Sequence, residues 1–217
     1  MFKNILFDLD GTLINTNELI IETFQYTLKK HLGLEVTAEM MVPFFGEPLI
    51  ETLRRFDPGR ADDMLRTYRQ YNLEKHDQLT TLFPGTVETL SRLKRAGFKL
   101  GVVTSKMRLT ATRGIHLFGL DRFLDVVVTF EDTERHKPLG DPIEKALTLL
   151  PGLPETSLMV GDSPFDLKCA RNAGVKCAAA LWSIIPQHDL IADDPDYLLE
   201  KIYDLLPICL IEGVSEC

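Results

Sequence analysis

Two aspartates, Asp8 and Asp10, follow the apolar residues 5–7 near the start of the chain. The apolar run predicts a short buried strand, and the two-residue spacing directs both carboxyl groups to the same side of the strand exit. Gly11 permits an immediate turn, and Thr12 adds a hydroxyl beside the acids. Neighbouring carboxylates repel each other unless a positive group lies between them, most simply a hard divalent cation. The stretch predicts metal-assisted carboxylate chemistry, with a strand-end turn of solvated acids as the alternative.

The segments after residue 85 must position these acids, and there short apolar runs alternate with amphipathic stretches. Such alternation is typical of a parallel sheet with helices on both faces. The expected strands are residues 5–7, 99–103, 126–128, 157–160 and 175–181, and the expected helices are residues 86–96, 107–117, 142–150, 164–172 and 198–206. The predicted fold class is therefore α/β, with a doubly wound, Rossmann-like parallel sheet.

The block of residues 17–80 differs, because it contains no strand pattern. Apolar side chains at helical spacing predict helices over residues 18–31 and 60–77, with short helices in residues 37–56. The predicted organisation is a core formed by residues 1–16 and 81–217, interrupted by an all-helical insertion of residues 17–80. A turn at residues 45–48 is the predicted substrate-facing tip of this insertion, with an ordinary helix–helix turn as the alternative.

Further reactive side chains follow the later strands. Thr104 and Ser105 end the second strand, Lys137 precedes Pro138 after the third, and Asp162 and Asp166 follow the fourth. Each could be an ordinary helix cap, turn acid or surface lysine. Because ligands of parallel sheets bind at the carboxyl ends of the strands, their joint arrival at one edge favours a single active site.

Composition limits the classes of partner. The chain has 217 residues, 45% of them hydrophobic, and a formal net charge of −8, which argues against nucleic acid and anionic membranes as partners. Its four cysteines show no metal-binding spacing and predict free thiols in a reducing compartment. The first apolar run is too short for a signal peptide, and no run approaches a membrane span. We expect a cytoplasmic protein that acts on a small molecule; its oligomeric state stays open.

Four segments together resemble the motifs of the haloacid dehalogenase superfamily, in the order found in that family. They are Asp8-x-Asp10-Gly11-Thr12, Val102-Val103-Thr104, Lys137-Pro138 and Gly161-Asp162-x-x-x-Asp166. An aspartate two positions after the first one resembles the phosphatase branch, and the helical insertion resembles the small helical cap of the family. The resemblance implies a Mg²⁺-dependent phosphohydrolase that forms an aspartyl-phosphate.

The same resemblance assigns a role to each residue. Asp8 would attack phosphorus, and Asp10 would protonate the leaving oxygen and then deprotonate water. Thr104, the backbone at Ser105 and Lys137 would bind the transferring phosphoryl group. Mg²⁺ would be held by Asp8, by the backbone carbonyl of Asp10 and by Asp162, with Asp166 binding a metal water or orienting a ligand.

Within the superfamily, the nearest resemblance is to bacterial inorganic pyrophosphatases and to phosphoglycolate phosphatases. It is carried by residues 13–21, 68–72, 125–129 and 204–208, whereas residues 139–142 depart from the usual continuation after the lysine. We expect pyrophosphate to be the substrate, with phosphoglycolate or another small phosphomonoester as the alternative. A phosphoacceptor switch of the receiver type, or a noncatalytic binding module, is a more distant alternative, opposed by the length of the chain and by the insertion.

Overall fold

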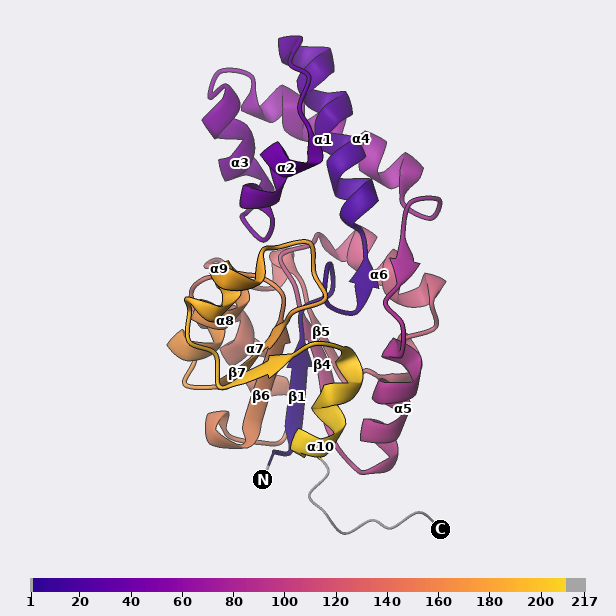
Figure 1. Ribbon diagram of the computed structural model, residues 1–217, viewed down its shortest axis with the longest axis vertical. Helices are drawn as coiled ribbons and strands as arrows, with labels where there is room; N and C mark the ends of the chain where they lie inside the picture. Colours follow the sequence, from indigo (N-terminus) through magenta and orange to yellow (C-terminus); the bar gives the residue numbers. More distant parts are fainter. Residues whose placement is uncertain (1, 210–217) are drawn as a thin grey trace.

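The computed structural model describes residues 2–209 and has a parallel six-stranded sheet at its centre (Figure 1). The strand order is β5-β4-β1-β6-β7-β8, and every neighbouring pair is parallel. The strands are β1 (Asn4–Phe7), β4 (Lys99–Val103), β5 (Val126–Val128), β6 (Ser157–Gly161), β7 (Lys176–Ala180) and β8 (Tyr197–Leu199). The expected α/β fold class is confirmed.

Helices cover both faces of this sheet because the side chains of each strand alternate between two apolar clusters. Ile5 and Phe7 pack in one cluster and Leu6 in the other, and all three are fully buried. The first cluster includes residues of α5 (Thr86–Arg95), α6 (Arg108–Leu117) and α10 (Leu205–Cys209). The second includes residues of α7 (Asp141–Leu149), α8 (Pro164–Asn172) and α9 (Gln187–Ile191).

The helices of residues 17–80 form a separate layer beyond the carboxyl ends of the strands (Figure 1). They are α1 (Asn17–Leu32), α2 (Ala38–Met41), α3 (Leu49–Phe56) and α4 (Ala61–Lys75), with a 3₁₀ turn η1 (Val42–Phe44). They enclose their own apolar cluster, in which the rings of Phe24 of α1 and Tyr68 of α4 pack edge to face with their centroids 4.9 Å apart. We refer to residues 17–80 as the helical insertion.

Two short strands mark the place where the chain leaves the core and returns. β2 (Ile14–Asn15) pairs antiparallel with β3 (Thr81–Leu82), at the base of the helical insertion. Strands of two residues are too short for a recognisable alternation of apolar and polar residues, so they were not predicted. The remaining 3₁₀ turns are η2 (Asp121–Phe123), η3 (Phe130–Asp132), η4 (Pro154–Thr156) and η5 (Ile202–Asp204).

The prediction of one helix over residues 198–206 is wrong. This segment contains strand β8, the turn η5 and the start of α10. Leu199 is fully buried, and its carbonyl accepts a hydrogen bond from the backbone N–H of Leu181 after β7. A short apolar run fits either a helix or a strand, and here the free edge of β7 decides between them. The short helix α9 was also missed.

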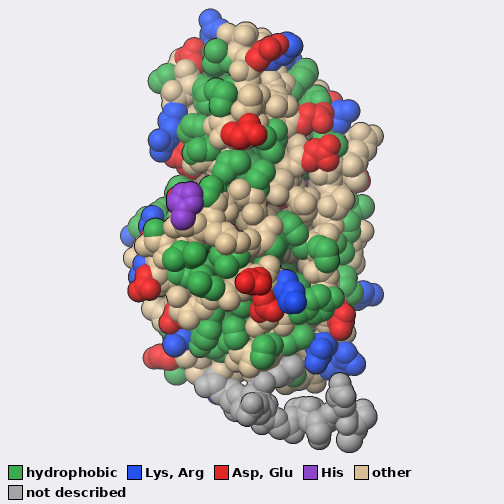
Figure 2. Space-filling view, in the orientation of Figure 1, with side chains coloured by type: hydrophobic (Ala, Val, Ile, Leu, Met, Phe, Trp, Pro, Cys, Tyr) green, Lys and Arg blue, Asp and Glu red, His purple; other side chains and the backbone are tan. Residues whose placement is uncertain are grey.

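None of the helices in residues 2–209 has both the length and the apolar character needed to cross a bilayer. Basic and acidic side chains are interspersed on the face seen in Figure 2. Cys169, Cys177 and Cys209 are buried free thiols, and Cys217 lies outside the described residues.

Candidate active site

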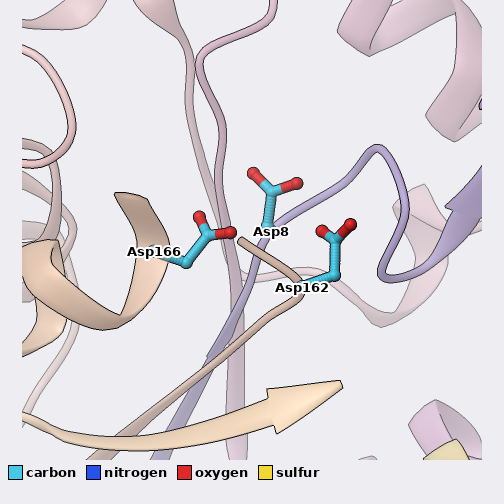
Figure 3. Close-up of side chains that lie close together, drawn as sticks. All are labelled: Asp8, Asp162 and Asp166. Atoms are coloured by element: carbon cyan, nitrogen blue, oxygen red, sulfur yellow. The ribbon is translucent and has the colours of Figure 1, made fainter. Parts of the chain in front are cut away.

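The predicted residues gather at the carboxyl edge of the sheet, below the helical insertion. Asp8, Thr104 and Asp162 follow β1, β4 and β6, which are adjacent strands, and Lys137 reaches the same place from the loop before α7. Figure 3 shows the carboxyl groups of Asp8 and Asp162, at two of these strand exits, beside that of Asp166 from α8. Chain segments more than 100 residues apart in sequence therefore share one site.

Lys137 is the central cation of this edge. Its ammonium group lies 2.7 Å from Oδ1 of Asp8, 2.7 Å from the carbonyl oxygen of Val103 and 2.5 Å from Oδ1 of Asp166. Burial lowers the pKa of Lys137, but the carboxylates of Asp166 and Asp8 outweigh that effect and raise it above its usual value. Lys137 is therefore charged at neutral pH and neutralises one of the neighbouring acids.

Asp162 is held by two hydroxyl groups. Thr12 Oγ1 donates to one carboxyl oxygen at 3.0 Å, and Ser183 Oγ donates to the other at 2.6 Å. Burial, followed by the neighbouring charge of Asp166, raises the pKa of Asp162 to about 7. Burial likewise raises the pKa of Asp8 well above its usual value, against the opposing effect of Lys137. Without a further cation, the raised pKa values therefore favour the protonated forms of the Asp8 and Asp162 carboxyl groups.

Asp166 is positioned by the start of α8. Ser163 is the N-cap residue: its hydroxyl accepts from the backbone N–H of Asp166, while Oδ2 of Asp166 accepts from the Ser163 backbone at 3.1 Å. This capping box fixes the first turn of the helix and turns the carboxyl group of Asp166 toward Lys137. Asp162 is left free of capping, contrary to the alternative reading of it as a cap.

Gly11 allows the turn after β1 to approach this cluster closely. Its φ of +81° lies in the left-handed region, and a Cβ atom at this position would collide with the carboxyl group of Asp162. Thr12, the next residue, thereby reaches Asp162 with its hydroxyl. The motif requires glycine for both its conformation and its lack of a side chain.

The donor set suits a hard divalent cation. Asp8, Asp162 and Asp166 each offer a carboxylate oxygen, and these oxygens lie within 4.8 Å of one another. All three residues are buried, and the nearby Lys137 balances only one of three negative charges. Oxygen donors with an excess of about two negative charges match Mg²⁺ better than a softer metal.

Asp10 lies outside this oxygen cluster. Its two carboxyl oxygens accept from Lys106 Nζ at 2.8 and 3.0 Å. In the structure each acid has a lysine partner of its own, Lys137 for Asp8 and Lys106 for Asp10. Thr104, two residues before Lys106, is buried, and its Oγ1 accepts a hydrogen bond from the backbone N–H of Lys106 at 3.2 Å. Ser105 Oγ is buried and has no hydrogen-bond partner within residues 2–209.

A cavity of about 560 Å³ opens above these groups, between the core and the helical insertion. Its floor includes Asp8, Asp10 and Lys106, whereas the opposite wall is largely apolar and includes Phe24, Phe44, Leu49 and Leu65. The arrangement can hold an anion at the strand ends and limit the access of water from the other side.

The match to known proteins agrees with this geometry. The family model described as haloacid dehalogenase-like hydrolase matches residues 5–180. The chain belongs to this family. It is an enzyme of the hydrolase type, as the resemblance of its four motifs predicted.

Relatives of this hydrolase cover nearly the whole chain. It is 51% identical over 212 residues to a protein of Caldanaerobacter subterraneus provisionally named pyrophosphatase PpaX, covering 98% of this chain and 96% of the relative. It is 46% identical over 206 residues to pyrophosphatase PpaX of Bacillus mycoides, and the match covers 95% of this chain and 96% of the relative. The solved structure of a haloacid dehalogenase-like family hydrolase from Streptococcus pneumoniae matches this fold with a TM-score of 0.87 at 28% sequence identity. The match covers 95% of this chain and 98% of that protein.

Three polar residues of this haloacid dehalogenase-like site were not predicted: Lys106, Ser163 and Ser183. Lys106 and Ser183 each follow a strand by three residues, so the strand-exit rule that selected Thr104 applies to them as well. Ser163 stands three residues before Asp166, which is the spacing of a capping box. Both spacings are therefore visible in the sequence itself.

Proposed function

We propose that this hydrolase is a Mg²⁺-dependent phosphohydrolase that cleaves inorganic pyrophosphate through an aspartyl-phosphate. The observation that carries the proposal is the buried Asp8 carboxylate, 2.7 Å from Lys137, at a strand exit that opens into the cavity. The relatives named pyrophosphatase PpaX support the choice of substrate.

In the first step, a carboxylate oxygen of Asp8 attacks one phosphorus of pyrophosphate. A bond forms between that oxygen and phosphorus, the bond from phosphorus to the bridging oxygen breaks, and its electron pair leaves with the second phosphate. When the substrate carries one proton, that phosphate departs as hydrogenphosphate and charge balances without a proton from the enzyme. Burial places Asp8 among fixed donors instead of water, which favours a defined line of attack.

The chain supplies donors for the transferring group. Thr104 and the backbone N–H of Ser105 would bind its oxygens, and Lys137 would balance the charge of Asp8 and of the attached phosphoryl group. Asp8, Asp162 and the Asp10 carbonyl would hold Mg²⁺, which supplies charge neutralisation when bound. Asp166 would orient Lys137 and a metal water.

In the second step, Asp10 acts as the base. It takes a proton from the water that attacks the phosphorus of the aspartyl-phosphate, and phosphate leaves while the Asp8 carboxylate is restored. Asp10 stands two residues beyond Asp8 and lines the same cavity. In this mechanism Asp8 is the nucleophile and Asp10 is the general acid/base.

The helical insertion would act as a cap. We assign residues 1–16 and 81–217 to the catalytic core and residues 17–80 to the cap, because the insertion has its own apolar cluster and forms one wall of the cavity. Residues 45–48 are the proposed tip. Gly46 at this tip approaches Ser163 of the core so closely that a Cβ atom would lie 2.7 Å from its Oγ.

Phosphoglycolate, or another small phosphomonoester, is the second candidate. The apolar wall of the cavity favours it, since Phe24, Phe44 and Leu49 offer surface for an organic group that pyrophosphate lacks. A solved protein of the same fold from Lactobacillus plantarum, provisionally described as a phosphoglycolate phosphatase, has a TM-score of 0.88 at 23% identity, covering 96% of this chain and 99% of its own.

Phosphate release from a panel of substrates tests the proposal. Pyrophosphate, 2-phosphoglycolate, sugar phosphates and nucleotides are compared with and without Mg²⁺, and pyrophosphate should give the highest kcat/KM. Repeated turnover would separate an enzyme from a phosphoacceptor switch, which takes up one equivalent. A markedly higher kcat/KM for phosphoglycolate would refute pyrophosphate as the preferred substrate. Full turnover after exhaustive chelation would refute the requirement for Mg²⁺.

A further inference from the structure

Lys106 is a nearly buried cation whose role the mechanism above leaves open. Its side chain is 9% exposed, it lines the cavity, and its Nζ lies 2.8 and 3.0 Å from the two carboxyl oxygens of Asp10. Asp10 is more accessible, with 23% of its side chain exposed. The pair therefore lies at the surface of the cavity, where a ligand can reach both partners.

The two lysines of the site differ in their unused donors. An ammonium group has three N–H donors, and Lys137 directs them at three different acceptors: Asp8, Val103 and Asp166. Lys106 contacts one carboxylate, and within residues 2–209 its ammonium has no other hydrogen-bond acceptor. Of these two lysines, Lys106 is thus the one that can take on an anionic ligand without breaking the contacts of the nucleophile, and Arg69 of α4 lines the cavity as well.

The position of Lys106 indicates which part of the substrate it meets. An acid that protonates the leaving oxygen must lie beside that oxygen, so the partner of Asp10 lies on the leaving-group side as well. Thr104, two residues before Lys106, is assigned to the transferring group, and its hydroxyl fixes the Lys106 backbone at 3.2 Å. The loop of residues 104–106 therefore reaches from one phosphate position to the next.

We propose that Lys106 binds the departing phosphate of pyrophosphate and so selects substrates whose leaving group is itself an anion. The inference rests on the proposed pyrophosphatase function and deepens it. On substrate binding, the ammonium group of Lys106 would share its donors between Asp10 and an oxygen of the second phosphate. This contact grows stronger as the bridging bond breaks, because the departing phosphate then gains negative charge.

The test compares pyrophosphate with 4-nitrophenyl phosphate. Both leaving groups are weak bases, so neither needs much help from a general acid, but only the leaving group of pyrophosphate is a phosphate. In Lys106→Met, kcat/KM for pyrophosphate should fall about 10- to 100-fold, as expected for the loss of a charged hydrogen bond. For 4-nitrophenyl phosphate it should change less than about threefold, and Lys106→Arg should keep the wild-type ratio of the two substrates.

Lys145→Met is the matched control, because Lys145 is an exposed lysine of α7 that does not line the cavity. It removes the same charge and should leave both substrates unchanged. If Lys106→Met does not reach the wild-type melting temperature, Lys106→Gln serves the same comparison.

Two results overturn the inference alone, provided that the wild-type enzyme hydrolyses pyrophosphate. The first is an equal loss of kcat/KM for both substrates in Lys106→Met, which would mean that Lys106 acts on a feature common to both substrates. The second is an unchanged kcat/KM for pyrophosphate with an equal loss of kcat for both substrates, which would mean that Lys106 acts by positioning Asp10 in the shared second step. A wild-type enzyme without pyrophosphate turnover overturns the proposed function and this inference together.

Discussion

The strand-end site and the wall of the helical insertion face each other across one cavity, yet they are built differently. The strand ends carry buried charges, each with a named partner: Asp8 with Lys137, Asp166 with Lys137 and Ser163, and Asp162 with two hydroxyl groups. The opposite wall consists mainly of aromatic and aliphatic side chains that belong to a separate apolar cluster. The difference teaches that charge chemistry is the task of the core, while the insertion shapes the cavity.

The energetics of the two regions differ in the same way. Buried carboxylates are costly unless they are paired, and of the three that cluster here, two contact Lys137 and the third, Asp162, has only hydroxyl partners. The site is therefore sensitive to the loss or gain of a single charge. The wall depends on apolar contacts, whose losses are graded by size. We expect large effects from substitutions at the strand ends and smaller ones from the insertion.

The largest effect is expected for Asp8→Asn. Without a nucleophile the first step cannot occur, so kcat should fall at least about 10⁴-fold. Single-turnover trapping with labelled substrate should recover an acyl phosphate, labile to alkali and hydroxylamine, on the wild-type enzyme and none on the variant. Because the amide keeps the size of the side chain, the far-UV spectrum should be unchanged, and a near-normal rate would rule out Asp8 as nucleophile.

The second effect concerns Asp10→Asn and depends on the leaving group. Glycolate leaves as a strong base and needs a proton, so formation of the aspartyl-phosphate from phosphoglycolate should slow by about 10²- to 10⁴-fold. From pyrophosphate, whose leaving group is a weak base, the intermediate should still form and then persist, because its hydrolysis lacks a base. Rapid-quench trapping measures both rates, and equal slowing with the two substrates would contradict the assignment.

The third effect is expected for Asp162→Asn and has two readouts. Loss of one metal ligand should lower activity about 100-fold. In the metal-free wild type, folding raises the pKa of Asp162 from 3.8 to about 7, so the folded protein binds more protons than the unfolded protein between these values. The contribution of Asp162 to the free energy of unfolding is therefore present near pH 4 and declines as the pH rises toward 7.

Thermal melting in a chelator tests that sign. Relative to Asp162→Asn, the wild-type melting temperature should fall as the pH is raised from 4 to about 8, in a range set by the two pKa values. Added Mg²⁺ at the high end should raise the wild-type melting temperature and have little effect on the variant. A wild type that gains stability against the variant over this range would show that Asp162 is ionised without metal.

The smallest effect tests the other side of the comparison, with two glycines of the insertion. Gly46 and Gly33 have φ values of +83° and +68°, so alanine at either position carries a similar conformational cost of roughly 1–2 kcal/mol. A Cβ atom at Gly33 meets nothing within 4 Å, whereas at Gly46 it meets the side chain of Ser163.

Both alanine variants should therefore lose similar thermal stability, but Gly46→Ala should also raise KM for pyrophosphate about tenfold by moving the tip away from the core. The two melting curves and the two KM values check this directly. If Gly33→Ala raises KM as much, the contact between residues 45–48 and the core has no special part in binding.

The sequence by itself determined the α/β fold class, the family and which residues arrive at one edge of the sheet. This was possible because strand exits of a parallel sheet coincide, so Asp8, Thr104 and Asp162 could be grouped from their places after apolar runs. Short-range patterns also predicted most helices, including the end of α1 at Gly33, which adopts the left-handed conformation. Local periodicity and turn chemistry act over a few residues and are therefore written in the chain itself.

Only the tertiary structure decided which side chains of the site are hydrogen-bond partners. Lys137 meets Asp8 across 129 positions, Lys106 meets Asp10 across 96, and Ser183 meets Asp162 across 21. It also made a strand of residues 197–199, because the free edge of β7 offered hydrogen bonds that an isolated helical turn could not match. Such pairings depend on which groups packing leaves adjacent and unsatisfied, a property of the assembled sheet that no local pattern encodes.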